Sequence, residues 1–145
     1  MKTIFLSVIL IALLACQVET NIEASNPSLT KINGQWQLSK TSIGYPMPDG
    51  PNEIKVVDTE IISFNASKKT FTRTINGKVT ETTTFDVKKV SNNGSEEREA
   101  VVFEKEKKYA YLTFDDANAA IILYETVPIG AELADGNSYH YQKVK

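Results

Sequence analysis

Few side chains in this sequence could carry out chemistry. The chain has one cysteine, Cys16, and one histidine, His140, so these residue types form no pair for a metal site or for nucleophilic catalysis. Asp115 and Asp116 could bind a cation, but the Ala-Asn that follows makes them more typical of a turn. The sequence also contains no glycine-rich phosphate loop. We therefore expect no enzymatic activity, no metal and no cofactor.

The N-terminal segment has the layout of a signal peptide. One positive charge at Lys2 precedes an almost unbroken apolar run, residues 4–15, which is too short to span a bilayer as a permanent helix. The run ends in Leu-Leu-Ala-Cys at residues 13–16. An ordinary signal-peptide cut after Ala15 would place Leu13 where a small residue is needed. The ending instead resembles the lipobox of bacterial lipoproteins, with leucine, a small residue and then cysteine directly after the cut.

This resemblance implies that Cys16 is the lipid anchor. In that family the cysteine thiol takes a diacylglycerol, and cleavage then makes the cysteine the acylated N-terminus. Each buried methylene contributes ~0.8 kcal/mol, so two or more acyl chains would hold the protein on a membrane permanently. Gln17 and Val18 supply no aspartate for inner-membrane retention, so the resemblance favours the outer membrane of a bacterial cell envelope. The alternative is a plain secreted protein with one free thiol.

The remaining chain divides into a tether and one domain. Residues 16–31 are polar, unpatterned and interrupted by Pro27, which indicates a flexible tether. Residues 32–145 are numerous enough to bury a normal core, and this core must stabilise the domain without a disulfide because Cys16 is the only cysteine. The formal net charge of −2 and the lack of basic clusters argue against nucleic acid as a partner.

Short runs rich in β-branched and aromatic residues, separated by Asn, Asp, Gly and Lys, predict an all-β antiparallel meander. The links between most runs are tight, which makes successive strands antiparallel neighbours. Residues 95–108 contain many Glu and Lys residues and look helical, but their apolar residues are clustered rather than spaced at helical intervals, so we expect a strand hairpin. The expected strands are residues 34–40, 53–57, 59–65, 70–76, 78–90, 99–105, 109–115, 119–126 and 138–144.

The hairpin over residues 70–87 has two different faces. Its odd positions include Phe71 and Phe85, whereas threonines occupy most even positions, so we expect the odd face to be buried. A two-residue turn would pair odd residues with even ones and mix the faces. We therefore expect a three-residue loop, residues 75–77, with Gly77 in the left-handed conformation that its missing Cβ allows.

One charged residue, Arg73, lies on this odd face between Phe71 and Ile75. In the expected register it lies near Glu81 across the hairpin. A charged side chain among apolar neighbours reaches solvent at a barrel end, pairs with a neighbour, or meets an anionic ligand. The sequence leaves these three alternatives open.

The run Gly34-Gln35-Trp36 resembles the Gly-x-Trp motif that opens the first strand of lipocalins. The likeness extends over residues 31–145, including a final strand typical of small bacterial lipocalin-like lipoproteins. In that family the indole plugs the closed end of an eight-stranded β-barrel. An arginine near the end of the barrel packs across the indole, and here only Lys143 or Lys145 is available for that place. The resemblance therefore implies an eight-stranded lipocalin-like barrel.

Eight strands enclose just enough space for side chains or for one small ligand. We therefore expect a membrane-anchored lipocalin-like protein that binds a small apolar or amphipathic molecule. The alternative is a protein–protein interaction module, such as an enzyme inhibitor or envelope-assembly factor, built on a filled barrel. The proline-rich segment 43–51 is either a lid over the open end or a stiff connector. The expected ligand-binding residues are Tyr45, Met47, Phe71, Arg73, Phe85 and Phe114.

Overall fold

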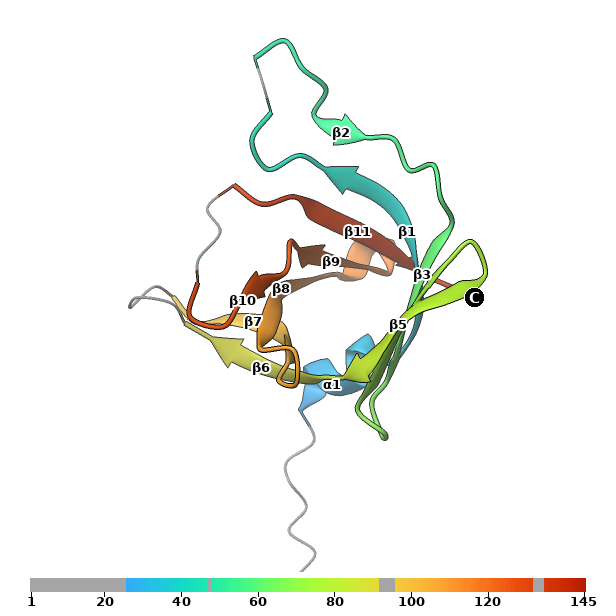
Figure 1. Cartoon of the computed structure of the whole chain (residues 1–145), viewed down its shortest axis with the longest axis vertical. Helices are drawn as coiled ribbons and strands as arrows, with labels where there is room; N and C mark the ends of the chain where they lie inside the picture. The colour runs from blue at the N-terminus through green and yellow to red at the C-terminus, as the bar shows by residue number, and fades with distance from the viewer. Residues whose placement is uncertain (1–25, 47, 92–95, 132–134) are drawn as a thin grey trace, which may run out of the picture.

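The computed structural model describes residues 26–46, 48–91, 96–131 and 135–145, which are almost entirely β-structure (Figure 1). A short helix, α1 (Pro27–Ile32), precedes the strands, and a 3-10 turn, η1 (Asp116–Asn118), interrupts them. The strands are β1 (Gly34–Ser42), β2 (Glu53–Ile54), β3 (Glu60–Asn65), β4 (Thr70–Ile75), β5 (Lys78–Thr84), β6 (Asp86–Val90), β7 (Arg98–Phe103), β8 (Lys108–Asp115), β9 (Ala120–Tyr124), β10 (Val127–Pro128) and β11 (Ser138–Lys143).

The strands form one antiparallel sheet that curls into a half-barrel (Figure 1). Their order is β5-β4-β3-β1-β11-β9-β8-β7-β6, while β2 pairs with β1 and β10 pairs with β8 beside this path. Most partners are neighbours along the chain, and the last strand, β11, returns to pair with the first, β1. The predicted all-β antiparallel meander is therefore confirmed. The hairpin predicted over the Glu- and Lys-rich stretch is also confirmed, as β7 and β8.

The single strand predicted over residues 78–90 is wrong, because it is divided at Phe85 into β5 and β6. β5 pairs with β4, whereas β6 pairs with β7, so the chain changes partners at this residue. The Phe85 amide donates a 2.9 Å hydrogen bond to the Lys69 carbonyl, and its ring is buried in the core. A single buried residue, Phe85, thus connects β5 and β6, the first and last strands in the order of the sheet.

The turn between β4 and β5 has two residues, so the predicted three-residue loop is also wrong. Ile75 pairs directly with Lys78. Asn76 and Gly77 form the turn with φ values of 50° and 78°, and two successive positive φ values match the right-handed twist of a hairpin. The left-handed conformation predicted for Gly77 is confirmed.

A bulge in β5 keeps the two faces of this hairpin apart. Thr74 pairs with Val79 and Arg73 pairs with Glu81, which leaves Thr80 as the extra residue. One extra residue reverses the alternation, so the odd positions beyond it face inward as expected. Val79 lies before the bulge and is 57% exposed, contrary to the prediction that it is buried.

The flexible tether predicted to reach residue 31 is wrong for its last residues, which form α1. Asn26 caps the helix by accepting a 3.0 Å hydrogen bond from the Ser28 amide, and Pro27 occupies the first turn, where proline is favoured. The Asn26 side chain also donates a 2.7 Å hydrogen bond to the Val87 carbonyl. These contacts stabilise a helix that the polar local sequence did not indicate.

Trp36 and α1 fill one end of the half-barrel. The indole is 4% exposed and donates a 2.7 Å hydrogen bond to the carbonyl of Ile32, which is fully buried. Lys143 Nζ lies 5.2 Å from the centroid of the indole ring, within the range of a cation–π contact. Of the two lysines considered above, Lys143 therefore packs across the tryptophan.

The main core lies inside the curl and contains a chain of phenylalanines. Successive ring centroids are 4.9 Å apart for Phe85 and Phe64, 5.2 Å for Phe64 and Phe71, and 5.1 Å for Phe71 and Phe103. All four rings are buried, and their tilted and edge-on contacts are those that aromatic side chains prefer. This part of the interior is therefore filled.

A smaller core lies on the opposite face of β7 and β8. Ala100 and Val102 alternate with residues of the main core and pack with Tyr109 and Val127. The Tyr109 hydroxyl donates a 2.9 Å hydrogen bond to the Ala131 carbonyl, which holds the chain after β10 over this face. Within the described ranges, no helix is long and apolar enough to cross a membrane.

Candidate functional site

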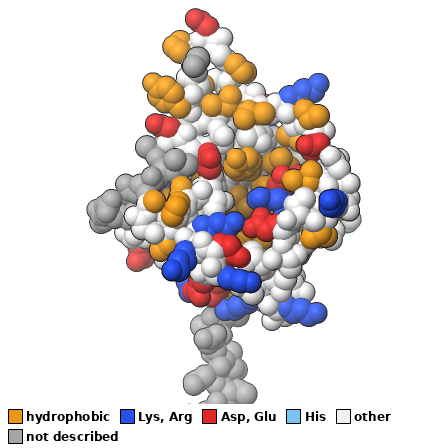
Figure 2. Space-filling model, viewed as in Figure 1, with side chains coloured by type: hydrophobic (Ala, Val, Ile, Leu, Met, Phe, Trp, Pro, Cys, Tyr) orange, Lys and Arg blue, Asp and Glu red, His pale blue; other side chains and the backbone are white. Residues whose placement is uncertain are grey.

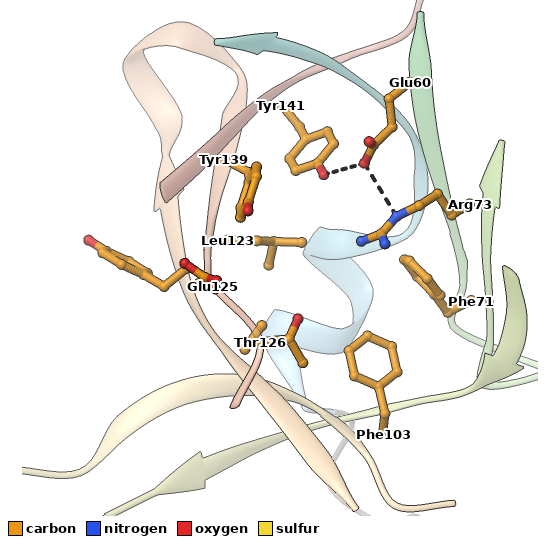
Figure 3. Close-up of a pocket in the computed structure, with 11 residues that line it drawn as sticks. Glu60, Phe71, Arg73, Phe103, Leu123, Glu125, Thr126, Tyr139 and Tyr141 are labelled. Atoms are coloured by element: carbon orange, nitrogen blue, oxygen red, sulfur yellow. Dashed lines mark hydrogen bonds and ion pairs between the residues drawn. The ribbon is translucent and has the colours of Figure 1, made fainter. Parts of the chain in front are cut away.

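A cavity of about 360 Å³ lies in the half-barrel beside the phenylalanine chain (Figure 3). Its lining combines aromatic and aliphatic side chains with a few ionisable groups. In Figure 2, acidic and basic side chains gather near the centre of the face viewed, next to apolar ones. The lining residues are Glu60, Phe71, Arg73, Phe103, Ala110, Leu123, Tyr124, Glu125, Thr126, Tyr139 and Tyr141.

A chain of polar contacts crosses one wall of the cavity. The Tyr141 hydroxyl donates a 2.7 Å hydrogen bond to Glu60 Oε1, and the same oxygen lies 3.3 Å from Arg73 Nε. Arg73 Nη1 is 3.4 Å from Glu81 Oε2, and Lys108 Nζ is 3.0 Å from Glu81 Oε1. The groups alternate in charge from Glu60 to Lys108, so each ion in the chain has an opposite neighbour.

Arg73 is thus paired with neighbours, which was one of the three alternatives left open by the sequence. Its side chain is 36% exposed, and Figure 3 shows the guanidinium pointing into the cavity. The buried Nε forms an ion pair with Glu60 but makes no hydrogen bond to a described residue. The predicted proximity of Arg73 and Glu81 across the hairpin is confirmed.

Tyr141 supplies a fixed hydrogen-bond donor to this wall. Its side chain is almost completely buried, and burial together with the negative charge of Glu60 raises the pKa of the phenol well above its usual range. The phenol consequently stays protonated at physiological pH and donates to the carboxylate.

Glu125 lies on the other side of the cavity. In Figure 3 it is separated from Arg73 by Leu123. Glu125 follows β9 directly, and its Oε2 accepts a 2.9 Å hydrogen bond from the Asn137 amide. Tyr139 lines the cavity as well, so this second wall combines a carboxylate with aromatic surface. Tyr124 also belongs to the lining, but its ring contacts Arg98 at 5.1 Å.

The structure brings together some of the residues predicted to bind a ligand. Phe71 and Arg73 both line the cavity. Phe85 is buried against Phe64 in the filled part of the core. Phe114 packs at the α1 end, where Lys31 Nζ lies 4.3 Å from its ring centroid. Neither Phe85 nor Phe114 contributes to the cavity lining.

The remaining predicted residues do not line the cavity or are not described. Tyr45 is 74% exposed on the connection between β1 and β3 and is absent from the lining. Met47 and Cys16 lie outside the described residues.

Residues 43–46 and 48–57 form a flap that extends away from the half-barrel (Figure 1). The strand β2 ties the flap to β1. At its base, a Cβ on Gly44 would lie 2.2 Å from the Gly136 carbonyl oxygen, so only glycine permits this close approach. Large apolar side chains on the flap are exposed, namely those of Tyr45, Ile54 and Val57.

Several cavity residues were not predicted, although a sequence signal existed for some. Glu60 has the same parity as Ile62 and Phe64, both buried, so strand alternation alone would have placed it inside. Tyr139 and Tyr141 share a parity in the last strand in the same way. Glu125 has the same parity as Ile121 and Leu123, both buried, so alternation over the expected strand 119–126 would have placed it inside too, although β9 ends at Tyr124.

Other candidate groups lie elsewhere. The two carboxylate oxygens of Asp115 accept hydrogen bonds from the backbone and side chain of Asn118, which confirms the predicted turn. His140 Nε2 lies 3.1 Å from Ser42 Oγ, and burial lowers the pKa of the imidazole. In the described part of the chain, no three His, Cys, Asp or Glu side chains are grouped so that they could hold a metal ion.

Comparison of the chain with family models, with curated proteins and with solved structures finds no match.

Proposed function

We propose that this chain is a lipocalin-like binding protein whose cavity takes one small amphipathic molecule. The cavity of about 360 Å³ is the observation that carries the proposal. Small-molecule sites usually measure roughly 300–1,000 Å³ and are mostly apolar, with a few polar groups that orient the ligand. The cavity lies at the lower end of this range, which favours a compact ligand. Its apolar part would contact Phe71, Phe103 and Leu123.

The arrangement of the strands supports a barrel of the lipocalin type. The sheet path contains nine strands, and β5 and β6 are separated only by Phe85. Counted as one bent strand, they give the eight-stranded meander that the resemblance implies. The contact of Lys143 with Trp36 supports the same assignment, because Lys143 takes the place of the arginine that packs across the first-strand tryptophan in that family.

Membrane attachment through Cys16 is part of the proposal and rests on the sequence pattern of residues 1–16. A lipid on Cys16 would hold the cavity close to a membrane surface, where amphipathic molecules accumulate. The outer membrane of a bacterial envelope is the proposed location.

A variant that fills the cavity tests the proposal. Ala110 lies on β8, is 3% exposed and lines the cavity, so Ala110→Phe places a ring inside it. We expect the purified protein to bind the neutral dye N-phenylnaphthylamine at one site, and Ala110→Phe to weaken binding about tenfold or more. Val79→Phe adds similar bulk on the exposed outer face and should leave binding unchanged. Native mass spectrometry should also detect small molecules that copurify with the unmodified protein.

The alternative, a protein–protein interaction module, is favoured by a different observation. Tyr45, Ile54 and Val57 expose apolar surface on the flap, and exposed apolar patches often mark interaction sites. If the purified protein takes up no dye and carries no small molecule, the cavity proposal is wrong and the flap becomes the site to examine.

A further inference from the structure

We infer that the cavity selects ligands whose polar end is an ammonium group rather than a carboxylate. This inference rests on the proposed function, since it specifies the class of molecule that the same cavity binds. It reverses the simplest expectation from an inward-facing arginine, which is that Arg73 receives an anion.

The charges around the cavity leave an excess of carboxylate. Glu60 and Glu125 line it directly, with Arg73 as the cationic lining residue. Glu81 and Lys108 form an ion pair with each other at the end of the same polar chain. These three carboxylates and two cationic groups together carry a formal charge of −1. Arg98 lies outside this set, 5.1 Å from the centroid of the Tyr124 ring. A monovalent cation would neutralise this charge, whereas an anion would increase it.

Arg73 is already occupied by carboxylates on two sides. Its Nε is 3.3 Å from Glu60 and its Nη1 is 3.4 Å from Glu81. An incoming carboxylate near this guanidinium would therefore also approach two negative groups. The side chains of Glu60 and Glu81 are only 18% and 25% exposed, so solvent screens that repulsion less than it would at an open surface.

Glu125, in contrast, has no cationic partner among the described residues. Its Oε2 accepts a hydrogen bond from a backbone amide, which is a neutral donor. A carboxylate at the edge of a cavity with only this partner can accept a charge-assisted hydrogen bond from an ammonium group. Glu125 is therefore the residue that we assign to the ligand's cationic end.

Aromatic rings supply a second feature suited to an organic cation. Tyr139 and Tyr141 line the cavity, and Figure 3 shows Tyr139 between Glu125 and Tyr141. The faces of such rings attract ammonium groups, and aromatic residues recur in sites for organic cations. Phe71 and Phe103 lie deeper and suit the apolar tail. The expected ligand is thus a short amine with an apolar chain or ring.

Three probes of equal chain length separate this inference from the proposed function. Octylamine, octanol and octanoate each compete with N-phenylnaphthylamine for the purified protein at pH 7, where the amine is protonated and the acid ionised. We expect octylamine to displace the dye at about a tenfold lower concentration than octanol, and octanoate to be the weakest competitor.

Glu125→Gln tests the assigned residue. The glutamine amide oxygen can still accept the hydrogen bond from the Asn137 backbone amide, but the negative charge is lost. In this variant the affinity for octylamine should fall about tenfold, while the affinity for octanol should not change. Glu104→Gln is the matched control, because it removes the same charge from an exposed side chain that pairs with Lys88 away from the cavity. It should leave all three probes unchanged.

The outcomes are distinct. If octanol or octanoate competes better than octylamine, or if Glu125→Gln and Glu104→Gln have equal effects, the ammonium inference is wrong and the binding function stands. If Ala110→Phe leaves dye binding unchanged, the dye lies elsewhere and both proposals are wrong. Preference for octylamine that Glu125→Gln abolishes supports both.

Discussion

The Tyr141 hydroxyl and the Glu60 carboxylate, 81 positions apart in the chain, are joined by a 2.7 Å hydrogen bond. Tyr141 belongs to β11 and Glu60 to β3, and the sheet order places β1 between these two strands. The bond therefore reaches across an intervening strand on the inner face of the curl. It links the end of the domain to its first half and also holds the carboxylate that pairs with Arg73.

Removing this hydrogen bond should destabilise the fold. Tyr141→Phe keeps the buried ring but leaves the partly buried Glu60 with one partner fewer, and a hydrogen bond to a charged group contributes roughly 1.5–3 kcal/mol. We expect a loss of about 2 kcal/mol in the free energy of unfolding, measured by urea denaturation. Tyr139→Phe is the control, because the Tyr139 hydroxyl makes no hydrogen bond to another described residue. Equal losses for the two variants would contradict the prediction.

The turn at Asn76 and Gly77 should depend on its backbone conformation alone. Gly77 has φ of 78°, and a Cβ added there would contact nothing within 4 Å, so any cost comes from the dihedral angle. Gly77→Val should lower the free energy of unfolding by about 1–3 kcal/mol, because a β-branched residue tolerates this region poorly. Gly77→Asn should cost much less, since asparagine is common at positive φ. A valine variant as stable as the asparagine variant would count against this turn.

His140 should make the fold less stable in mild acid. Burial, and then the charge of Lys40, lower the pKa of its imidazole below the usual value of 6.5, while Glu53 and Asp115 oppose that shift. The unfolded chain therefore binds a proton more readily, so stability is lost as pH falls below about 6.5 through the folded-state pKa. His140→Gln removes this titration. The melting temperature should fall more in the unmodified protein than in His140→Gln between about pH 7 and pH 5. Parallel curves would refute the assignment.

Processing at Cys16 should be abolished by Cys16→Ser, because the resemblance to lipoproteins assigns lipid attachment to the thiol. In a bacterial host, the variant should accumulate as a longer precursor without incorporated palmitate, as judged by metabolic labelling and gel mobility. Ser7→Ala, inside the apolar run, should mature and acquire lipid normally. A Cys16→Ser protein that still matures and fractionates with membranes would show that the anchor lies elsewhere.

Strand identity was predictable because it depends on local alternation. In the hairpin around Phe71, the inward and outward positions differ so strongly in character that the buried face could be read directly from the sequence. The same parity would have identified Glu60 and Tyr141 as inward residues. The pairing of Arg73 with Glu81 also followed from keeping one face buried, even though the predicted loop length was wrong.

The sequence by itself determined an all-β meander, its approximate strand boundaries and the inward face on which Arg73 lies, since these follow from a two-residue period and local turn chemistry. Only the tertiary structure decided that a bulge at Thr80 corrects the register, that residues 27–32 become a helix, and that Glu125 faces Arg73 across a cavity. The physical reason is distance along the chain. A bulge, a short polar helix and a cavity wall are stabilised by residues remote in sequence. Asn26 bonds to Val87, and Glu125 bonds to Asn137. A local sequence pattern does not predict such contacts.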